Sequence, residues 1–162
     1  MKEENGMKKL VLAFLMLFAI TACGAEDEPD VEYPVEYYGA EVTGSVVDDD
    51  EIVMTIVGEG FYEMTAEVTV SRSTGEITAF TVTDHSESES WGGVLIEKGE
   101  LSDALVDYSD DLSALSLDDY VVIDEDWASD YDVEAGATVG TTGEAMLDIA
   151  LGALEHYEAY YE

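Results

Sequence analysis

The sequence predicts an α+β domain, with an antiparallel sheet of about four to six strands, packed helices and a C-terminal amphipathic helix. Two observations carry this prediction. Between residues 39 and 82, apolar and polar residues alternate with the period of β-strands, and turn residues separate the segments. After residue 93, apolar residues instead recur every three or four positions, which is the period of an α-helix. Strands followed by helices are typical of the α+β class.

The strand region begins with a hairpin. Glu41–Val47 and Ile52–Val57 are rich in β-branched residues and flank the acidic turn Asp48–Glu51. In the third segment, Tyr62–Val70, apolar residues alternate with Glu and Thr, which predicts a strand with one wet face. A Ser-Thr-Gly turn then leads into the alternating strand Ile77–Val82.

The helical region follows. Apolar spacing between Val94 and Leu117 predicts one helix or two short ones that pack on the sheet. Tyr120–Ile123 is predicted to be a strand, and Asp124–Tyr131 an acidic loop. The last helix is expected to begin near Gly143, and its apolar stripe consists of Ala145, Met146, Ile149, Ala150, Ala153, Leu154 and Tyr157.

Two features concern the ends of this last helix. Thr141 lies three residues before Glu144, the spacing of a capping box in which both side chains satisfy free backbone N–H groups. His156 lies near the other end, where the helix dipole favours a positive charge.

The N-terminal segment 1–22 is predicted to be an export signal. Lysines precede an apolar run, Leu10–Ile20, that is shorter than the roughly 20 residues needed to cross a bilayer. The run ends in Ile20-Thr-Ala-Cys-Gly24, which resembles a bacterial lipobox and implies lipidation at Cys23. The protein is therefore expected to be exported and anchored by lipid to the outer face of the bacterial cell membrane. Translation could start at Met1 or at Met7.

Residues 23–38 are predicted to be an acidic linker, since they contain both prolines, and residues 39–162 the folded domain. The whole chain has a formal charge of −34, from 39 Asp and Glu against 5 Lys and Arg. Beyond residue 22 only Arg72 and Lys98 are basic. This charge excludes nucleic acid as a partner, because phosphates would be repelled.

The stretch Asp132-Val-Glu-Ala-Gly-Ala-Thr138 precedes the last helix, where backbone N–H groups and the helix dipole favour an anion such as a phosphate. It resembles the flavinylation motif Asp-x-x-(Ser/Thr)-Gly-Ala-Thr of the FMN-binding domain family. That family occurs in sodium-pumping quinone reductases, Rnf-type electron-transport complexes and extracellular flavoproteins. Ala135 stands where the family has Ser or Thr. An ordinary turn before a capped helix is the structural alternative.

The resemblance extends over residues 39–157. Gly58-x-Gly60-Phe-Tyr62, the turn before Glu76-Ile-Thr78, and His85-Ser-Glu87 are similar to the family's glycine-rich segment, its Gly-Lys-Ile-Thr turn and its His-x-Glu-Thr loop. His85 and Glu87 thereby become candidates for flavin contact, with a solvated loop histidine as the alternative for His85. Trp91 and Trp127 could cover a flavin ring or close an edge of the core.

The resemblance implies a cofactor and partners. FMN would be attached through a phosphoester at Thr138 by a flavin transferase, with Asp132, Gly136 and Ala137 forming the rest of the motif. The protein would be an extracytoplasmic electron carrier rather than a stand-alone catalyst, with a membrane flavin or quinone reductase as donor and membrane lipid bound through Cys23. A covalent ester would hold the anionic cofactor in a chain that has few cations to bind its phosphate.

Two other classes of function are alternatives to electron transfer. An acidic lipoprotein could bind a cation or small ligand without redox activity, through the acidic runs Asp48–Glu51 and Asp124–Asp126. Neither run has the spacing of an EF-hand loop. A hydrolase has the weakest support, because the chain has no Gly-x-Ser-x-Gly elbow or His-Glu-x-x-His helix and only His85 and His156 to act as a base.

Overall fold

The computed structural model describes residues 29–88, 92–117 and 139–162. These residues form a five-stranded antiparallel sheet with helices packed on it, which confirms the predicted α+β class and the C-terminal helix. The predicted strand Tyr120–Ile123 and the predicted loop Asp124–Tyr131 lie outside the described residues, as does the whole signal segment 1–22.

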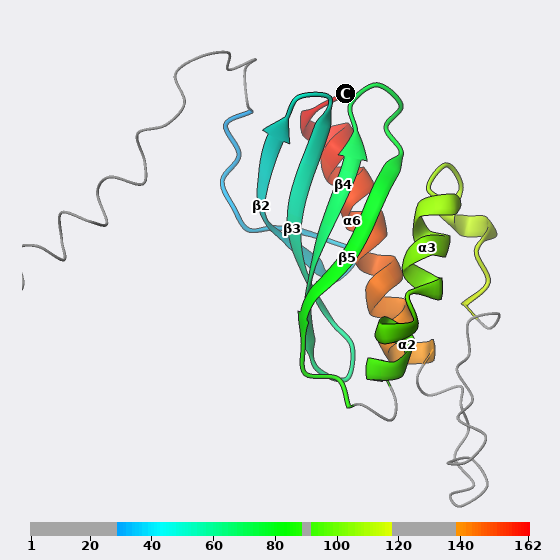
Figure 1. Cartoon of the computed structure of the whole chain (residues 1–162). Coiled ribbons are helices and arrows are strands. Elements are labelled where there is room, and N and C mark those ends of the chain that lie inside the picture. The colour runs from blue at the N-terminus through cyan, green and yellow to red at the C-terminus, as the bar shows by residue number, and fades with distance from the viewer. Residues whose placement is uncertain (1–28, 89–91, 118–138) are drawn as a thin grey trace, which may run out of the picture.

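Each strand of the sheet pairs with the next one along the chain, in the order β1-β2-β3-β4-β5 (Figure 1). The strands are β1 Val35–Tyr37, β2 Ala40–Asp48, β3 Glu51–Glu59, β4 Glu63–Ser71 and β5 Ile77–His85. The four strands predicted between residues 41 and 82 are therefore confirmed, and β4 alternates between buried and wetter positions as expected. Asp49 has a φ of 53° in the β2–β3 turn, a conformation that Asp tolerates better than most residues.

The fold begins earlier than the predicted linker allows. Val35–Tyr37 pairs with β2, so that Val35 lies opposite Val42 and Tyr37 opposite Ala40. Tyr33 also packs against the hydrophobic core. The two prolines and the acidic residues of this segment indicated a linker, whereas its valine and tyrosines give it an apolar face that the sheet and the last helix bury.

Two short helices follow the sheet, which confirms the second of the two alternatives for residues 94–117. α2 spans Gly92–Lys98, α3 spans Glu100–Asp107, and a short 3₁₀ turn, η1, spans Leu112–Ala114. Gly99 separates α2 from α3 with a φ of 70°, a left-handed conformation that glycine adopts without strain and that an α-helix cannot continue.

The last helix, α6, spans Glu144–Tyr160 and is preceded directly by a π-helical turn, η3, at Val139–Gly143. A start near Gly143 is confirmed, but the predicted capping box is wrong. Gly143 itself has helical dihedral angles, φ −65° and ψ −41°, and no side-chain hydrogen bond caps the helix there. Because helical backbone already begins at Val139, Thr141 lies inside η3 rather than ahead of the helix.

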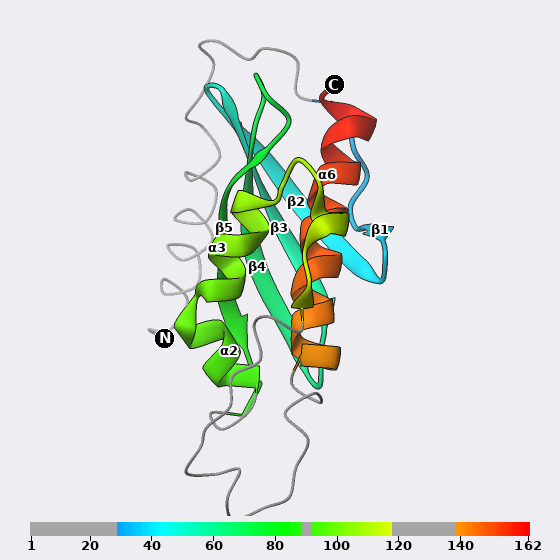
Figure 2. The same cartoon turned by 90° about the vertical axis from the view of Figure 1, so that its right-hand side faces the viewer.

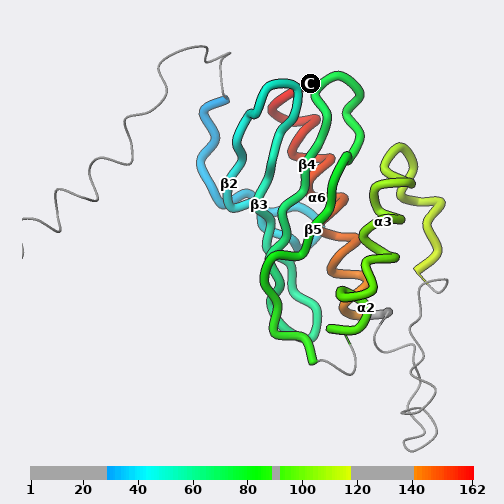
Figure 3. The backbone as a smooth tube through the Cα atoms, in the orientation of Figure 1, coloured from blue at the N-terminus to red at the C-terminus, as the bar shows by residue number. Residues whose placement is uncertain are grey.

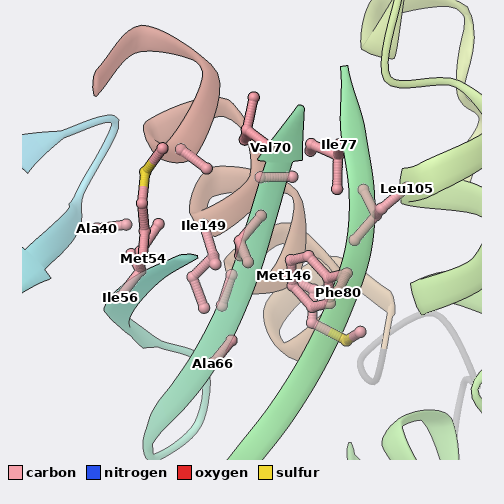
Figure 4. Packing of buried hydrophobic residues seen from close by; sticks show 14 of the residues in the cluster. Ala40, Met54, Ile56, Ala66, Val70, Ile77, Phe80, Leu105, Met146 and Ile149 are labelled. Carbon is pink, nitrogen blue, oxygen red and sulfur yellow. The ribbon is translucent and has the colours of Figure 1, made fainter. Parts of the chain in front are cut away.

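The core lies between the sheet and a layer formed by α2, α3 and α6 (Figure 2). Side chains from β3 and β4 meet the predicted apolar stripe of α6, in which every residue except the partly buried Leu154 is buried (Figure 4). Gly58 allows β3 and α6 to approach closely, since a Cβ atom there would lie 2.8 Å from Cδ1 of Ile149. None of the described helices is long and apolar enough to span a membrane.

The two ends of the sheet differ in what they bring together (Figure 3). The β3–β4 turn, the end of β5, α2 and the start of α6 gather at one end. The β2–β3 turn, the β4–β5 turn and the C-terminus gather at the other. The residues that precede η3, among them the predicted flavinylation motif, therefore join the described structure at the first of these ends.

Candidate functional site

A buried carboxylate lies at the end of the sheet where α6 begins. Glu87 follows β5 by two residues and is only 7% exposed. Its Oε1 atom accepts a hydrogen bond from the backbone N–H of Tyr62, at 3.1 Å, in the β3–β4 turn. Its Oε2 atom accepts one from the hydroxyl of Thr142, at 3.0 Å, in η3. Glu87 therefore links the β3–β4 turn to η3, the turn that directly precedes α6.

These two hydrogen bonds explain how an acidic side chain can be buried here. An unpaired buried carboxylate is costly, and hydrogen bonds to both of its oxygens offset that cost. Thr142 is completely buried and its hydroxyl has a defined acceptor, so neither side chain is left unsatisfied. The pair fixes the position of η3 relative to the sheet.

Two glycines make room for the pair. A Cβ atom on Gly92 would lie 2.3 Å from Oε2 of Glu87 and 2.4 Å from Oγ1 of Thr142. A Cβ atom on Gly60 would lie 2.7 Å from Oε1 of Glu87. All three distances are shorter than van der Waals contact, so a side chain at either glycine would displace the carboxylate from its hydrogen bonds.

A pocket of about 350 Å³ opens beside the carboxylate. Among the described residues it is lined by Phe61, Tyr62, Glu87 and Ser88. Its volume lies at the lower end of the range of about 300–1,000 Å³ found for small-molecule sites. Two aromatic rings and one fixed polar group form a lining suited to a flat, largely apolar ring.

The predicted site residues are distributed unevenly with respect to this pocket. Glu87, a candidate for flavin contact, lines it. His85 ends β5, opposite Met64, and is half-buried, with no hydrogen-bond partner for its Nδ1 atom among the described residues. The structure does not place His85 in the lining of the pocket.

The other predicted site residues, Asp132, Gly136, Ala137, Thr138, Trp91 and the lipidation residue Cys23, lie outside the described residues, as does Trp127. Thr138 is the residue immediately before Val139, the first residue of η3. Thr142, four residues after Thr138, contacts Glu87, which itself lines the pocket. Thr138 is thus adjacent in the chain to η3, the turn whose Thr142 donates a hydrogen bond to Glu87.

Sequence reasoning missed the partners of Glu87. Thr142 was not singled out, although a threonine beside an apolar helical stripe is a weak sign of a buried hydrogen bond. The glycine-rich segment and the predicted strand Tyr62–Val70 include Phe61 and Tyr62 but do not indicate that they line a pocket. The contact between Glu87 and Thr142 joins residues 55 positions apart, and no local pattern indicates it.

A second buried polar residue lies at the opposite end of α6. His156 is completely buried, and its Nε2 atom lies 3.2 Å from the Tyr33 hydroxyl. Its ring centroid is 4.8–6.1 Å from those of four tyrosines, Tyr33, Tyr37, Tyr160 and Tyr161. Burial lowers the pKa of His156. The interpretation of His156 as a charged residue favoured by the helix dipole is therefore wrong, because removal from water favours the neutral ring.

This burial predicts a stability that falls on acidification. The pKa of His156 is lower in the folded chain than its ordinary value of 6.5. The stability that depends on a neutral His156 ring is therefore fully present above pH 6.5 and is lost as the pH falls towards the pKa of the folded chain. The free energy of unfolding should decrease by up to about 1.4 kcal/mol per pH unit in this window. Urea unfolding between pH 7.5 and 5 measures it, and His156→Gln should show a smaller slope. Equal slopes for the two proteins would contradict this prediction.

The described residues contain no cluster of side chains suited to bind a metal ion. Within residues 29–88, 92–117 and 139–162, no group of three or more His, Cys, Asp or Glu side chains is placed to hold a metal ion. The acidic turn Asp48–Glu51 lies within these residues, and the second acidic run, Asp124–Asp126, lies outside them.

Comparisons with known proteins add no relative. No family model, no curated protein and no solved structure matches the chain. The motif in the sequence and the geometry at the start of α6 are therefore the features that bear on function.

Proposed function

We propose that this protein is an extracytoplasmic electron carrier with FMN attached through a phosphoester at Thr138. The observation that carries the proposal is the pocket lined by Phe61, Tyr62 and Glu87 at the end of the sheet where η3 begins. Val139, the first residue of η3, directly follows the threonine that the motif marks as the acceptor. A cofactor tethered at Thr138 would thus be held close to a pocket that suits a flat ring.

The residues present fit FMN in shape and in chemistry. The exposed faces of Phe61 and Tyr62 offer stacking surfaces for an isoalloxazine ring. The start of η3 and α6 offers N–H groups and the positive end of a 17-residue helix to a phosphate. When bound, FMN would supply the electron-transfer chemistry, and the chain would supply anchoring, orientation and a local environment.

The distribution of charge favours a covalent link over ionic binding of the phosphate. Beyond residue 22 the only basic side chains are those of Arg72 and Lys98. The Arg72 backbone N–H donates to Asp50 in the β2–β3 turn, and Arg72 thus lies at the opposite end of the sheet from Glu87. Since proteins commonly hold phosphates with arginine or lysine, an ester at Thr138 explains how this acidic chain would retain an anionic cofactor.

The setting of the carrier follows from the N-terminal segment. Lipidation at Cys23 would tether it to the outer face of the cell membrane. A flavin transferase would attach the cofactor, and a membrane flavin or quinone reductase would be the electron donor. An acidic lipoprotein that binds a cation or small ligand remains the alternative, and flavin attachment separates it from the carrier.

Flavin fluorescence in a denaturing gel tests the proposal. The full chain is expressed with and without a bacterial flavin transferase, denatured, separated and illuminated before staining. Fluorescence at the position of the protein is expected only with the transferase. A chain that stays dark with an active transferase, shown active on a known substrate in the same cells, would rule the proposal out.

A further inference from the structure

The β3–β4 turn presents two large aromatic side chains to solvent. Phe61 is 49% exposed and Tyr62 is 56% exposed, and the two are consecutive in the chain. Single exposed apolar residues are common on protein surfaces, but a contiguous pair beside a pocket is typical of an interaction site.

This aromatic pair is held in a fixed position. The Gly60 N–H donates to the carbonyl oxygen of Tyr62 at 3.0 Å, which closes the turn. The Tyr62 N–H donates in turn to the buried Glu87. Because the backbone of the turn is tied to the core, little conformational freedom of that backbone remains to be lost when a partner covers the rings.

Two carboxylates flank the rings. Glu59 and Glu63 are exposed and lie directly opposite each other in the register of β3 and β4. Like charges placed opposite each other across two strands destabilise a sheet. The pair therefore does not stabilise the turn, and both carboxylates project from the same face of the sheet, next to the aromatic pair in the chain.

We propose that Phe61 and Tyr62, with Glu59 and Glu63 beside them, form the docking surface for an electron-transfer protein that presents an apolar patch next to Lys and Arg side chains. Aromatic residues at the centre and complementary charges at the rim are what a specific interface requires. The position also fits the role, since the rings line the pocket proposed for the flavin. The inference rests on the proposed function in one respect, that the partner is an electron-transfer protein.

The negative charge of the chain also indicates which kind of protein can bind this surface. A second copy of this chain would bring another formal charge of −34 to the same surface and would be repelled. A cationic partner would instead be attracted over a distance, which raises its rate of encounter. The weak, small interfaces of redox partners suit a surface formed by one turn.

The chain contains a matched control for Glu59 and Glu63. Asp48 and Glu51 are likewise exposed and opposite each other, at the β2–β3 turn, and no aromatic residue lies between them. They are at the other end of β3, roughly 26 Å away at about 3.3 Å per strand residue. At physiological ionic strength the Debye length is about 8 Å, so charges there act only weakly on a partner at Phe61 and Tyr62.

The test uses mitochondrial cytochrome c, a lysine-rich redox protein, as the cationic probe. The ¹⁵N-labelled full chain in detergent is titrated with it at about 0.15 M salt, and NMR gives both Kd and the residues whose signals shift. The shifts should centre on residues 59–63. Phe61→Ser with Tyr62→Ser should weaken binding about tenfold or more. Glu59→Gln with Glu63→Gln should weaken it about fivefold, and Asp48→Asn with Glu51→Gln less than about twofold.

Equal weakening by the two carboxylate pairs, or shifts centred away from the turn, would overturn the inference. Thermal unfolding of each variant shows that the fold is kept. The titration uses the chain expressed without a flavin transferase, so that no cofactor covers Phe61 and Tyr62, and flavin attachment is measured separately by in-gel fluorescence. Failure of the docking surface and failure of the proposed function are thus distinguished.

Discussion

Replacing Thr138 by alanine is expected to abolish covalent flavin completely. The hydroxyl of Thr138 is the proposed acceptor of the FMN phosphate, and alanine has no oxygen with which to form the ester. The measurement is flavin fluorescence of the denatured chain after expression with a flavin transferase. A loss to background is expected, because no partial reaction is possible without the hydroxyl.

Thr141→Ala is the matched control for this substitution. Thr141 also carries a hydroxyl and lies three residues further along, inside η3. Flavin content should stay close to that of the original chain, since the motif ends at Thr138. Fluorescence that survives Thr138→Ala, or that disappears only with Thr141→Ala, would show that the motif has been assigned wrongly.

Replacing Glu87 by alanine is expected to have the largest effect on stability among single carboxylate substitutions in the described structure. The change removes the acceptor of two hydrogen bonds and leaves the Thr142 hydroxyl buried without it. The Tyr62 N–H loses its acceptor as well. An unsatisfied buried donor costs about 1–3 kcal/mol, so a loss of about 2–4 kcal/mol is expected for the pair. Urea unfolding at pH 7.5 measures the change in the free energy of unfolding.

Two variants separate hydrogen bonding from charge in this experiment. Glu87→Gln keeps one acceptor oxygen and should cost less than about 1.5 kcal/mol. Glu63→Ala removes an exposed carboxylate from the same region and should change stability by no more than about 0.5 kcal/mol. If Glu87→Ala were as stable as Glu63→Ala, the link between the β3–β4 turn and η3 would have no energetic importance.

The parts of the fold that were predictable are those with local patterns. β4 alternates strictly between apolar and polar residues, β3 is rich in β-branched residues, and each is bounded by turn residues. α6 has a continuous apolar stripe. Such patterns arise because one face of each element is buried against a single neighbouring layer.

The parts that were not predictable depend on contacts between distant residues. β1 is only three residues long and is held by β2 and by α6, more than a hundred residues later in the chain. The burial of His156 depends on Tyr33 in the segment before β1. η3 is a π-helical turn that contacts α2. The local Thr141–Glu144 spacing, which predicted a capping box, contains no sign of this contact.

The candidate site shows the same division. Glu87 became a candidate only through the resemblance of its loop to a family motif, because an isolated glutamate after a strand has no pattern of its own. Its roles as the acceptor for Tyr62 and Thr142 required the three-dimensional structure. The requirement for glycine at Gly60 and Gly92 likewise follows from their closeness to the carboxylate.

Peptide mass spectrometry of the native protein tests the central claim most directly. The protein is isolated from the membrane of its own host, digested with a protease, and the peptide that contains Asp132–Thr138 is fragmented. The predicted result is a peptide heavier by the mass of FMN minus one water, with fragments that place the addition on Thr138. An unmodified peptide from a host that flavinylates other proteins, or an addition on another residue, would contradict the account.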